Sequence, residues 1–211
     1  MIRYLYADQI DAYPHLASEM FRHRADQFHR RQGWAVNVDE QGEERDDYDA
    51  MNPLYVIWET PEGRHGGSMR FLPTVGRTMV NEHFADLTDG VHIASPLIWE
   101  CTRFCLAPGG GARISAALMQ AGGEIMDGFG IAHFVGVFDA RMVRIYRMIG
   151  AAPIIVGARG DGPDRISVGL WETNPVLKAR VARSSGISPE LSRHWFERAF
   201  GRPAVRLARE A

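Results

Sequence analysis

The chain has 211 residues, 45% of them hydrophobic, which suits one domain with a full core over residues 1–211. Its formal net charge of -2 provides no global positive field, so we expect no nucleic-acid partner. No apolar run approaches the roughly 20 residues of a membrane-spanning helix, and the first residues lack the basic and then apolar pattern of a signal peptide. We therefore expect a cytoplasmic protein without a membrane span.

Three strands, one long helix and one short helix or turn are predicted in the first half of the chain. After a short strand at residues 2–5, apolar side chains recur at helical spacing over residues 11–31. Arg24 lies on that apolar face, so its guanidinium either extends out to solvent or meets a ligand carboxylate. Strands are expected over residues 55–60 and 68–72, and a short helix or turn over residues 78–87.

Residues 39–49 hold seven acidic side chains and no aliphatic one. Such a segment is typical of a solvated loop. It is also what a mobile acidic lid over a cationic ligand requires. The sequence leaves both interpretations open.

The segment 98–106 is a predicted strand with charges in its middle. Pro96 and Pro108 bound it, and Glu100 and Arg103 lie inside it. A buried charge costs several kcal/mol unless it is paired or used, so the strand forms either an active-site floor or an edge strand with an incidental ion pair. The spacing of these two residues places them on opposite faces of a regular strand, an assignment that a β-bulge would change.

Two cysteines, Cys101 and Cys105, share this expected strand. Four positions along one strand are too far apart for a disulfide. No cluster of histidines accompanies them, so a zinc site is disfavoured. We expect both to be small buried hydrophobic side chains, and no metal.

The second half alternates between helices and strands. Glycines 109–111 open a helix over residues 112–129, an arrangement that can offer backbone N–H groups to an anion. Arg141, Arg144 and Arg147 recur every third residue of a helix at 140–149 and form one basic ridge, which is either a solvated face or a docking surface. The other expected elements are strands at 133–138, 153–156 and 166–173, helices at 176–183 and 189–200, and a frayed last dozen residues. This order predicts an α/β fold, a three-layer α/β/α sandwich around a mixed sheet.

Several unusual residues fall into one pattern. Arg24, Phe28 and Trp34, the motif D-x-Y-D at residues 46–49, S-M-R-F-L-P-T at 68–74, Phe84, and W-E-C-T-R-F at 99–104 resemble the acyl-homoserine-lactone synthases, the LuxI-type autoinducer synthases of bacterial quorum sensing. The resemblance runs from the N-terminus to about residue 173. It implies a GNAT-like fold with a mostly antiparallel sheet and an acyl-pantetheine cleft where strands 99–106 and 133–138 splay apart.

The resemblance also implies a reaction. The amine of S-adenosylmethionine attacks an acyl thioester carried by acyl carrier protein or coenzyme A. The carboxylate of S-adenosylmethionine then displaces the sulfonium, which closes the lactone and releases 5′-methylthioadenosine. S-adenosylmethionine is consumed as a substrate, so no cofactor is expected.

Roles for individual residues follow from the matching family positions. Glu100 is the expected general base. The expected S-adenosylmethionine side consists of Arg24, Phe28, Trp34, Asp46, Asp49, Arg70, Phe84 and Arg103. The expected acyl pocket consists of Phe104, Phe134, Gly136, Phe138 and Met142, and the expected docking surface for acidic acyl carrier protein is Arg141, Arg144 and Arg147.

Two departures from the family pattern affect these expectations. One extra residue separates Trp34 from the D-x-Y-D motif, so the acidic lid is expected to differ locally. Family members that make 3-oxo-acyl products often carry Thr where Gly136 aligns. Because glycine has no side-chain donor, Gly136 favours an acyl chain unsubstituted at C3.

Two other functions compete with this interpretation. A generic GNAT-like N-acyltransferase using acyl-coenzyme A is disfavoured, because its usual glycine loop is matched imperfectly and the N-terminal Arg, Trp and acidic residues would have no role. A non-catalytic acyl-homoserine-lactone sensor is disfavoured because no basic recognition helix for DNA is evident.

Overall fold

The computed structural model describes residues 1–201, which form one seven-stranded sheet in the order β1-β2-β3-β4-β5-β7-β6. All neighbouring strands are antiparallel except β4 and β5, which are parallel. The sheet is therefore mixed and mostly antiparallel, as expected. The strands are β1 (Ile2–Tyr6), β2 (Leu54–Glu59), β3 (His65–Pro73), β4 (Ile98–Leu106), β5 (His133–Asp139), β6 (Ile154–Arg159) and β7 (Ile166–Trp171).

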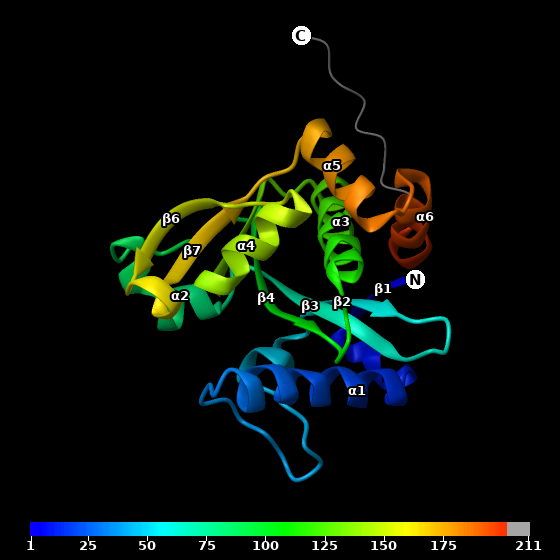
Figure 1. Cartoon of the computed structure of the whole chain (residues 1–211), viewed down its shortest axis with the longest axis horizontal. Helices are drawn as coiled ribbons and strands as arrows, with labels where there is room; N and C mark the ends of the chain where they lie inside the picture. Colours follow the sequence, from blue (N-terminus) through cyan, green and yellow to red (C-terminus); the bar gives the residue numbers. More distant parts are fainter. Residues whose placement is uncertain (202–211) are drawn as a thin grey trace.

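Helices cover both faces of the sheet. Figure 1 shows α1 on one side of strands β1–β4, with α3, α5 and α6 on the other. The three-layer α/β arrangement is confirmed. The helices are α1 (Pro14–Arg24), α2 (Met79–His83), α3 (Ala112–Phe129), α4 (Ala140–Ile149), α5 (Pro175–Ser185) and α6 (Pro189–Phe200), with short 3-10 turns η1 (Ala7–Ala12), η3 (Asp47–Met51), η4 (Ala85–Thr88) and η5 (Gly162–Asp164).

The predicted helix at residues 11–31 is divided in the structure. An α-helix ends at Arg24, and a π-helical segment, η2 (Ala25–Arg31), continues it. Wider turns of this kind are frequent at functional sites. The other predicted elements are present, with ends that differ by a few residues, and the frayed C-terminal end falls mostly on residues 202–211, which lie outside the described residues.

Strand β2 is buried on both faces, which explains its nearly continuous apolar sequence L-Y-V-I-W. Leu54 and Val56 face α3 and contribute to the larger core cluster. Tyr55 and Ile57 face α1 and join Met20 in the second cluster. None of the described helices is long and apolar enough to cross a bilayer.

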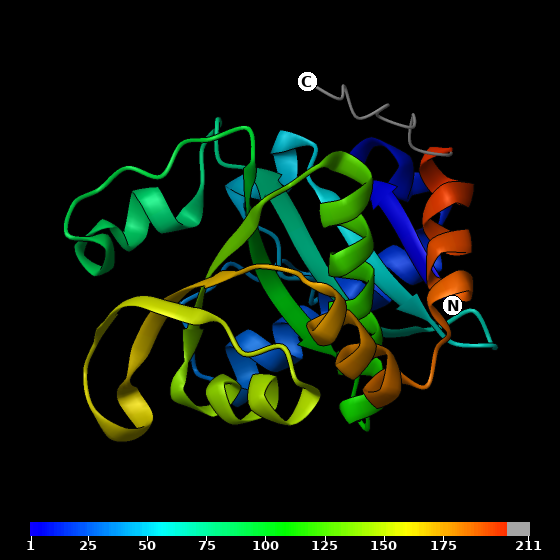
Figure 2. The same cartoon turned by 90° about the horizontal axis from the view of Figure 1, so that it is seen from above.

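The sheet divides between β4 and β5. These strands pair at only three positions, Ile98 with His133, Trp99 with Phe134 and Glu100 with Val135. Beyond Val135, β5 continues to pair with β7 as far as Asp139. In Figure 2 the yellow and orange β6–β7 hairpin curves away from the cyan and green strands. The splay that the family resemblance implied is therefore present.

A β-bulge lies in β4 at Arg103. Ser68 pairs with Cys105 and Arg70 pairs with Thr102, so β4 carries one residue more than β3 between these pairs. Arg103 takes a left-handed φ of 53°, a conformation that costs a residue other than glycine of the order of 1 kcal/mol. The bulge changes which way the following side chains point.

The bulge makes the opposite-face assignment of Glu100 and Arg103 wrong. Both side chains reach α2: Glu100 accepts a hydrogen bond from the backbone N–H of Met79, and Arg103 lies 3.7 Å from the Met79 sulfur. One extra residue shifts the alternation of the strand, so the two charges lie on the same face.

Candidate active site

Two buried arginines form the centre of the polar site. Arg24 and Arg70 are each 1% exposed. Arg24 donates through Nε to Glu44 at 2.6 Å and through both Nη atoms to Asp49 at 2.9 and 2.8 Å. Arg70 donates to Asp49 at 2.8 Å and binds both oxygens of Asp46. Arg24 therefore does not extend to solvent but pairs with the acidic segment.

Arg103 connects this network to β4. Its Nη2 lies 2.8 Å from Glu44 and 2.7 Å from Asp46. It is more accessible than the other two arginines, with 10% of its side chain exposed against 1% for each of them. Arg103 is thus the member of the network that a ligand can reach most readily.

The acidic segment is held down at one end. Asp46 accepts hydrogen bonds from the backbone N–H groups of Tyr48 and Asp49, and Asp49 accepts one from the backbone of Asp46, which is a reciprocal capping box. Tyr55 adds a 2.7 Å hydrogen bond to Asp49. The segment from Glu44 to Asp49 is therefore fixed by ion pairs, whereas residues 39–41 are exposed.

The electrostatics of Asp49 follow from these contacts. Burial raises the pKa of Asp49, but the adjacent guanidinium groups of Arg24 and Arg70 outweigh burial and hold the pKa far below its usual range. The carboxyl stays ionised at all physiological pH values, and its charge holds the two buried cations in place.

Phe28 and Trp34 form a stacked aromatic pair beside this network. Their ring centroids lie 5.3 Å apart with an interplanar angle of 11°, and the guanidinium of Arg103 is 5.4 Å from the Phe28 ring. Trp34 is 42% exposed. Phe84, by contrast, belongs to a separate cluster with Val80 and Leu87, so the structure does not bring it to Arg24, Arg70 and Arg103.

Glu100 caps a helix. Its carboxylate is 1% exposed and accepts hydrogen bonds from the backbone N–H of Met79 at 2.9 Å and of Val80 at 2.6 Å, at the start of α2. Burial raises the pKa of Glu100, and the two N–H bonds partly oppose that shift. The carboxyl is therefore a stronger base than an exposed glutamate.

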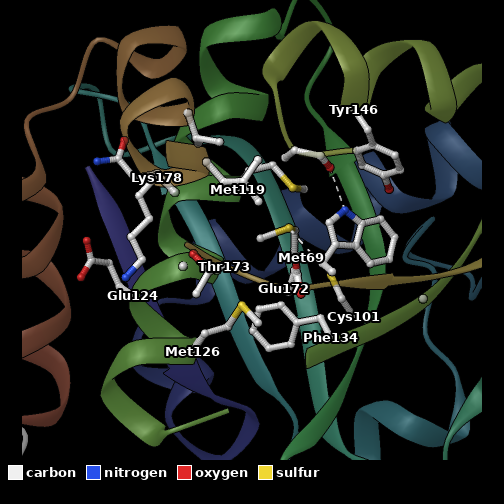
Figure 3. Close-up of a pocket in the computed structure, with 18 of the residues that line it drawn as sticks. Met69, Cys101, Met119, Glu124, Met126, Phe134, Tyr146, Glu172, Thr173 and Lys178 are labelled. Carbon is white, nitrogen blue, oxygen red and sulfur yellow. Dashed lines mark hydrogen bonds between the residues drawn. The ribbon is translucent and has the colours of Figure 1, made fainter. Parts of the chain in front are cut away.

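A pocket opens where β4 and β5 separate. It encloses about 1180 Å³, part of it open to solvent. Figure 3 shows the sulfur-containing side chains of Met69, Cys101, Met119 and Met126 at its centre. Thr102 and Arg103 line it as well, together with Phe71, Phe104, Phe134, Gly136, Tyr146 and Trp171. Strand β4 is thus a wall shared by the pocket and the arginine network.

Three of the expected acyl-pocket residues line this space: Phe104, Phe134 and Gly136. Phe138 and Met142 are not among its lining residues. The Phe138 ring packs behind the wall, 5.4 Å from Tyr146 and 5.5 Å from Trp171. Met142 is half-buried in the first turn of α4.

Gly136 is required by a close backbone approach. A Cβ atom at this position would lie 2.8 Å from the carbonyl oxygen of Cys101 and 3.2 Å from the Trp171 ring. Any larger residue would push β4 and β5 apart at the point where they separate.

The basic ridge is exposed. Arg141, Arg144 and Arg147 all lie on the open side of α4, and Arg141 forms a 3.4 Å ion pair with Asp139. No ion pair of Arg144 or Arg147 is found within residues 1–201. Both guanidinium groups are available to an acidic partner.

Cys101 and Cys105 are both free thiols, half-buried and buried respectively. Burial raises the pKa of Cys105 to about 12, so its thiol stays protonated. In the described part of the chain, no group of three or more His, Cys, Asp or Glu side chains is arranged to hold a metal ion.

Three residues of the site were not among those expected from the sequence: Glu44 of the arginine network, and Tyr146 and Trp171 of the pocket lining. Glu44 binds both Arg24 and Arg103, but seven acids share its segment and nothing in the sequence singles it out. Tyr146 lies on the apolar face of its helix, which indicates burial but not a position in a pocket.

The comparisons with known proteins point to one family. A family model described as autoinducer synthase matches residues 9–161. An acyl-homoserine-lactone synthase of Rhizobium etli is 37% identical over 194 residues, covering 87% of this chain and 91% of the relative. A second, from Agrobacterium fabrum strain C58, is 38% identical over 100 residues, 47% of each chain.

Solved structures agree in fold. The acyl-homoserine-lactone synthase LasI superposes with a TM-score of 0.75 at 25% identity, over 87% of this chain and 95% of that one. The synthase MesI superposes with a TM-score of 0.77 at 23% identity, over 89% of this chain and 96% of that one. An N-acetyltransferase of Lactobacillus plantarum shares the fold more distantly, with a TM-score of 0.53 at 12% identity, over 81% of this chain and 97% of that one. The matched length of the family model and the Rhizobium relative show that this chain belongs to the autoinducer synthases, acyltransferases that make acyl-homoserine lactones.

Proposed function

We propose that this enzyme acylates the amine of S-adenosylmethionine with an acyl thioester and then closes the lactone. The observation that supports this most directly is the position of Arg103, which binds Glu44 and Asp46 of the polar network and also lines the apolar pocket. A polar substrate and an acyl chain can therefore meet across β4. A structure of the relative BjaI holds S-adenosylmethionine and isopentyl-coenzyme A, and one of TofI holds 5′-methylthioadenosine.

The polar site suits a substrate that carries both signs of charge. Arg103 is the most accessible arginine and can bind the substrate carboxylate. The carboxylates of Asp46 and Glu44 place negative charge close to where the ammonium and sulfonium would lie. The stacked Phe28 and Trp34 rings offer an aromatic face to the adenine or the sulfonium.

Glu100 is proposed as the base that removes a proton from the amine. Its raised pKa brings it closer to the operating pH, which improves a general base. Both carboxylate oxygens already accept backbone hydrogen bonds and are buried, so the proton is proposed to travel through a water molecule. Backbone N–H groups of β4 beyond Glu100, which have no partner in β5, would stabilise the tetrahedral oxyanion.

The two steps balance in atoms and charge. The amine nitrogen bonds to the thioester carbon, the carbon–sulfur bond breaks, and the carrier leaves as a thiol with the proton. The carboxylate oxygen then attacks the γ-carbon, and the carbon–sulfonium bond breaks to release neutral 5′-methylthioadenosine. This second step is intramolecular and depends mainly on how the substrate is folded in the site.

The acyl donor is proposed to be acyl carrier protein, with acyl-coenzyme A as the second candidate. The exposed guanidinium groups of Arg144 and Arg147 favour an acidic carrier protein. The relatives MesI and BjaI are described as coenzyme A-dependent, which keeps the second donor open. We propose a cytoplasmic location, because both donors and S-adenosylmethionine are intracellular, and no cofactor beyond the consumed substrate.

Mass spectrometry of the products tests this function. Purified enzyme with S-adenosylmethionine and acyl donors of graded length is expected to yield an acyl-homoserine lactone and 5′-methylthioadenosine in equal amounts. Cells that express the chain are expected to secrete the same lactone. An open-chain amide without 5′-methylthioadenosine would indicate a generic N-acyltransferase, and lactone binding without turnover would indicate a sensor.

A further inference from the structure

The Tyr146 side chain is largely buried in the pocket wall, while its hydroxyl stays open to the pocket and has no hydrogen-bond partner among residues 1–201. Tyr146 is 5% exposed and lines the pocket from α4. Other buried tyrosines differ: Tyr55 donates to Asp49 at 2.7 Å and Tyr48 to Glu82 at 2.7 Å. The Tyr146 hydroxyl therefore makes no hydrogen bond to the described protein and can donate to an oxygen of a ligand that enters the pocket.

The other polar groups on this wall are already engaged. Thr102 accepts a 3.0 Å hydrogen bond from Arg70, and the Cys101 thiol contacts the Met69 sulfur at 3.9 Å. The Trp171 indole N–H donates to the carbonyl of Ala151 at 2.9 Å. Thr102 keeps its own O–H while it accepts the bond from Arg70, so Thr102 and Tyr146 are both neutral donors here, and Tyr146 is the one whose hydroxyl makes no hydrogen bond to the described protein.

The hydroxyl is kept neutral by its surroundings. Edge-on aromatic rings pack around the Tyr146 ring, with Trp171 at 5.2 Å, Phe138 at 5.4 Å and Phe104 at 6.5 Å between centroids. Burial raises the pKa of Tyr146 well above its usual range. The group is therefore a donor for an oxygen acceptor and not an acid or a base near neutral pH.

Tyr146 lies close to the point where β4 and β5 separate. Trp171, its ring neighbour, also packs 3.2 Å from the place that a Gly136 Cβ would take, one residue beyond the last β4–β5 pair. Figure 3 shows Tyr146 near Cys101 at one end of the pocket, with Glu124 and Lys178 at the other. If the thioester lies at the separation point, Tyr146 is level with the first carbons of the acyl chain.

We propose that the Tyr146 hydroxyl donates a hydrogen bond to an oxygen at C3 of the acyl chain, so that the enzyme prefers 3-oxo or 3-hydroxy donors to unsubstituted ones. The inference rests on the proposed function and names its acyl substrate class. It reverses the expectation from Gly136, which concerned a hydrogen-bond donor on β5. The Cys101 carbonyl restricts position 136 of β5 to glycine, and the hydrogen-bond donor comes instead from α4.

Kinetics with matched donors test the proposal. Wild type and Tyr146→Phe are compared with 3-oxo, 3-hydroxy and unsubstituted donors of one chain length on one carrier. We expect wild type to favour at least one oxygenated donor, and Tyr146→Phe to lower that preference in kcat/KM about 3- to 10-fold, the effect of one neutral hydrogen bond. Tyr4→Phe, which removes a hydroxyl from the core on β1, is expected to leave the preference unchanged.

The remaining outcomes decide against the proposal. An equal loss of kcat/KM for all three donors would mean that the hydroxyl acts on the thioester or supports the wall. An unchanged preference would mean that it binds no substrate oxygen. In both cases lactone still forms, whereas no lactone from any donor would overturn the proposed function itself.

Discussion

At the residue scale, Asp49 is the carboxylate shared by the two most buried cations of the site. It binds Arg24 and Arg70, both of which are almost fully buried, and it accepts a hydrogen bond from Tyr55. A buried arginine that loses its partner keeps its full desolvation penalty. The sequence left a solvated loop and a mobile lid open for residues 39–49, and the structure makes the acids at 44, 46 and 49 part of the core electrostatics.

Replacing Asp49 with Asn should strongly destabilise the fold. Two buried guanidinium groups would lose their shared carboxylate, which we expect to lower the free energy of unfolding by about 3–5 kcal/mol. Urea denaturation at pH 7 measures this. The matched control is Asp26→Asn, which breaks an exposed pair with Arg30 and should change stability by less than about 0.5 kcal/mol. Equal midpoints for the two variants would contradict the prediction.

The pH dependence of stability in wild type and Asp49→Asn gives an independent check. The pKa of Asp49 is far lower in the folded chain, so the unfolded state binds the proton more readily. Its stabilisation is complete above the ordinary aspartate pKa of about 4 and is lost as the pH falls below that value. The urea midpoint of Asp49→Asn should therefore fall less steeply than that of wild type below about pH 5.

Glu100→Gln should keep the fold and lose most of the turnover. The glutamine oxygen can still accept one of the two backbone hydrogen bonds at the start of α2, but the side chain takes no proton. We expect kcat to fall about 100-fold or more, the usual contribution of a general base. In wild type, kcat should fall as the pH drops through the raised pKa of Glu100. A variant that turns over at the wild-type rate would remove Glu100 as the base.

At the element scale, α4 serves two surfaces. Its inner face supplies Tyr146 to the pocket, while Arg144 and Arg147 lie exposed on its outer face. A carrier protein bound to the outer face would therefore be one helix away from the acyl pocket. That geometry is what delivery of a tethered acyl chain requires.

Charge reversal on α4 should weaken the use of the carrier. Arg144→Glu with Arg147→Glu is expected to raise KM for acyl carrier protein about 10-fold or more at low salt, and less at high salt because exposed charges are screened. KM for S-adenosylmethionine should change little. The control reverses Arg22 and Arg183, exposed on α1 and α5. Unchanged carrier kinetics would show that docking lies elsewhere.

At the scale of the whole molecule, the two parts of the sheet share only the three β4–β5 pairs and the helices packed across them. The pocket is lined from both parts, from Met69 on β3 to Trp171 on β7, so an acyl chain bound there would contact both. Such a ligand binds the folded state alone and stabilises it by mass action.

Binding of the acyl donor should therefore raise the melting temperature of the protein. At 100 times Kd the stabilisation is about 2.7 kcal/mol, which corresponds to roughly 5–10 °C for a domain of this size. Differential scanning calorimetry with acyl-coenzyme A, and with coenzyme A lacking the acyl chain as control, measures the effect of the acyl chain. Equal shifts for both would show that the chain does not enter the pocket.

Much of this architecture could be predicted because it depends on local patterns. The helices at 112–129 and 140–149 and the strand at 98–106 are found with their predicted bounds, since apolar periodicity and flanking Gly and Pro define them. Arg24, Asp46, Asp49, Arg70 and Arg103 were expected together from the family pattern, and the structure brings them into one network.

The remaining features depend on contacts between distant segments. The predicted face of the strand for Arg103 was wrong, because the bulge is set by the register of β4 against β3, which the sequence of β4 alone does not encode. Phe138 lies behind the pocket wall, not in it, because ring packing against Tyr146 and Trp171 decides its place. Glu44 could not be distinguished from its acidic neighbours until two arginines from different elements converged on it.

The sequence by itself determined the family, the order of elements and the residues that carry the charge. The tertiary structure alone decided that an acidic segment is pinned to two buried arginines, that Gly136 is imposed by the Cys101 carbonyl, and that an unpartnered Tyr146 hydroxyl faces the pocket. The physical reason is the range of the interactions: periodicity and turn chemistry act between residues near in sequence. Buried ion pairs, close backbone approach and hydrogen-bond satisfaction depend on which distant groups meet in space.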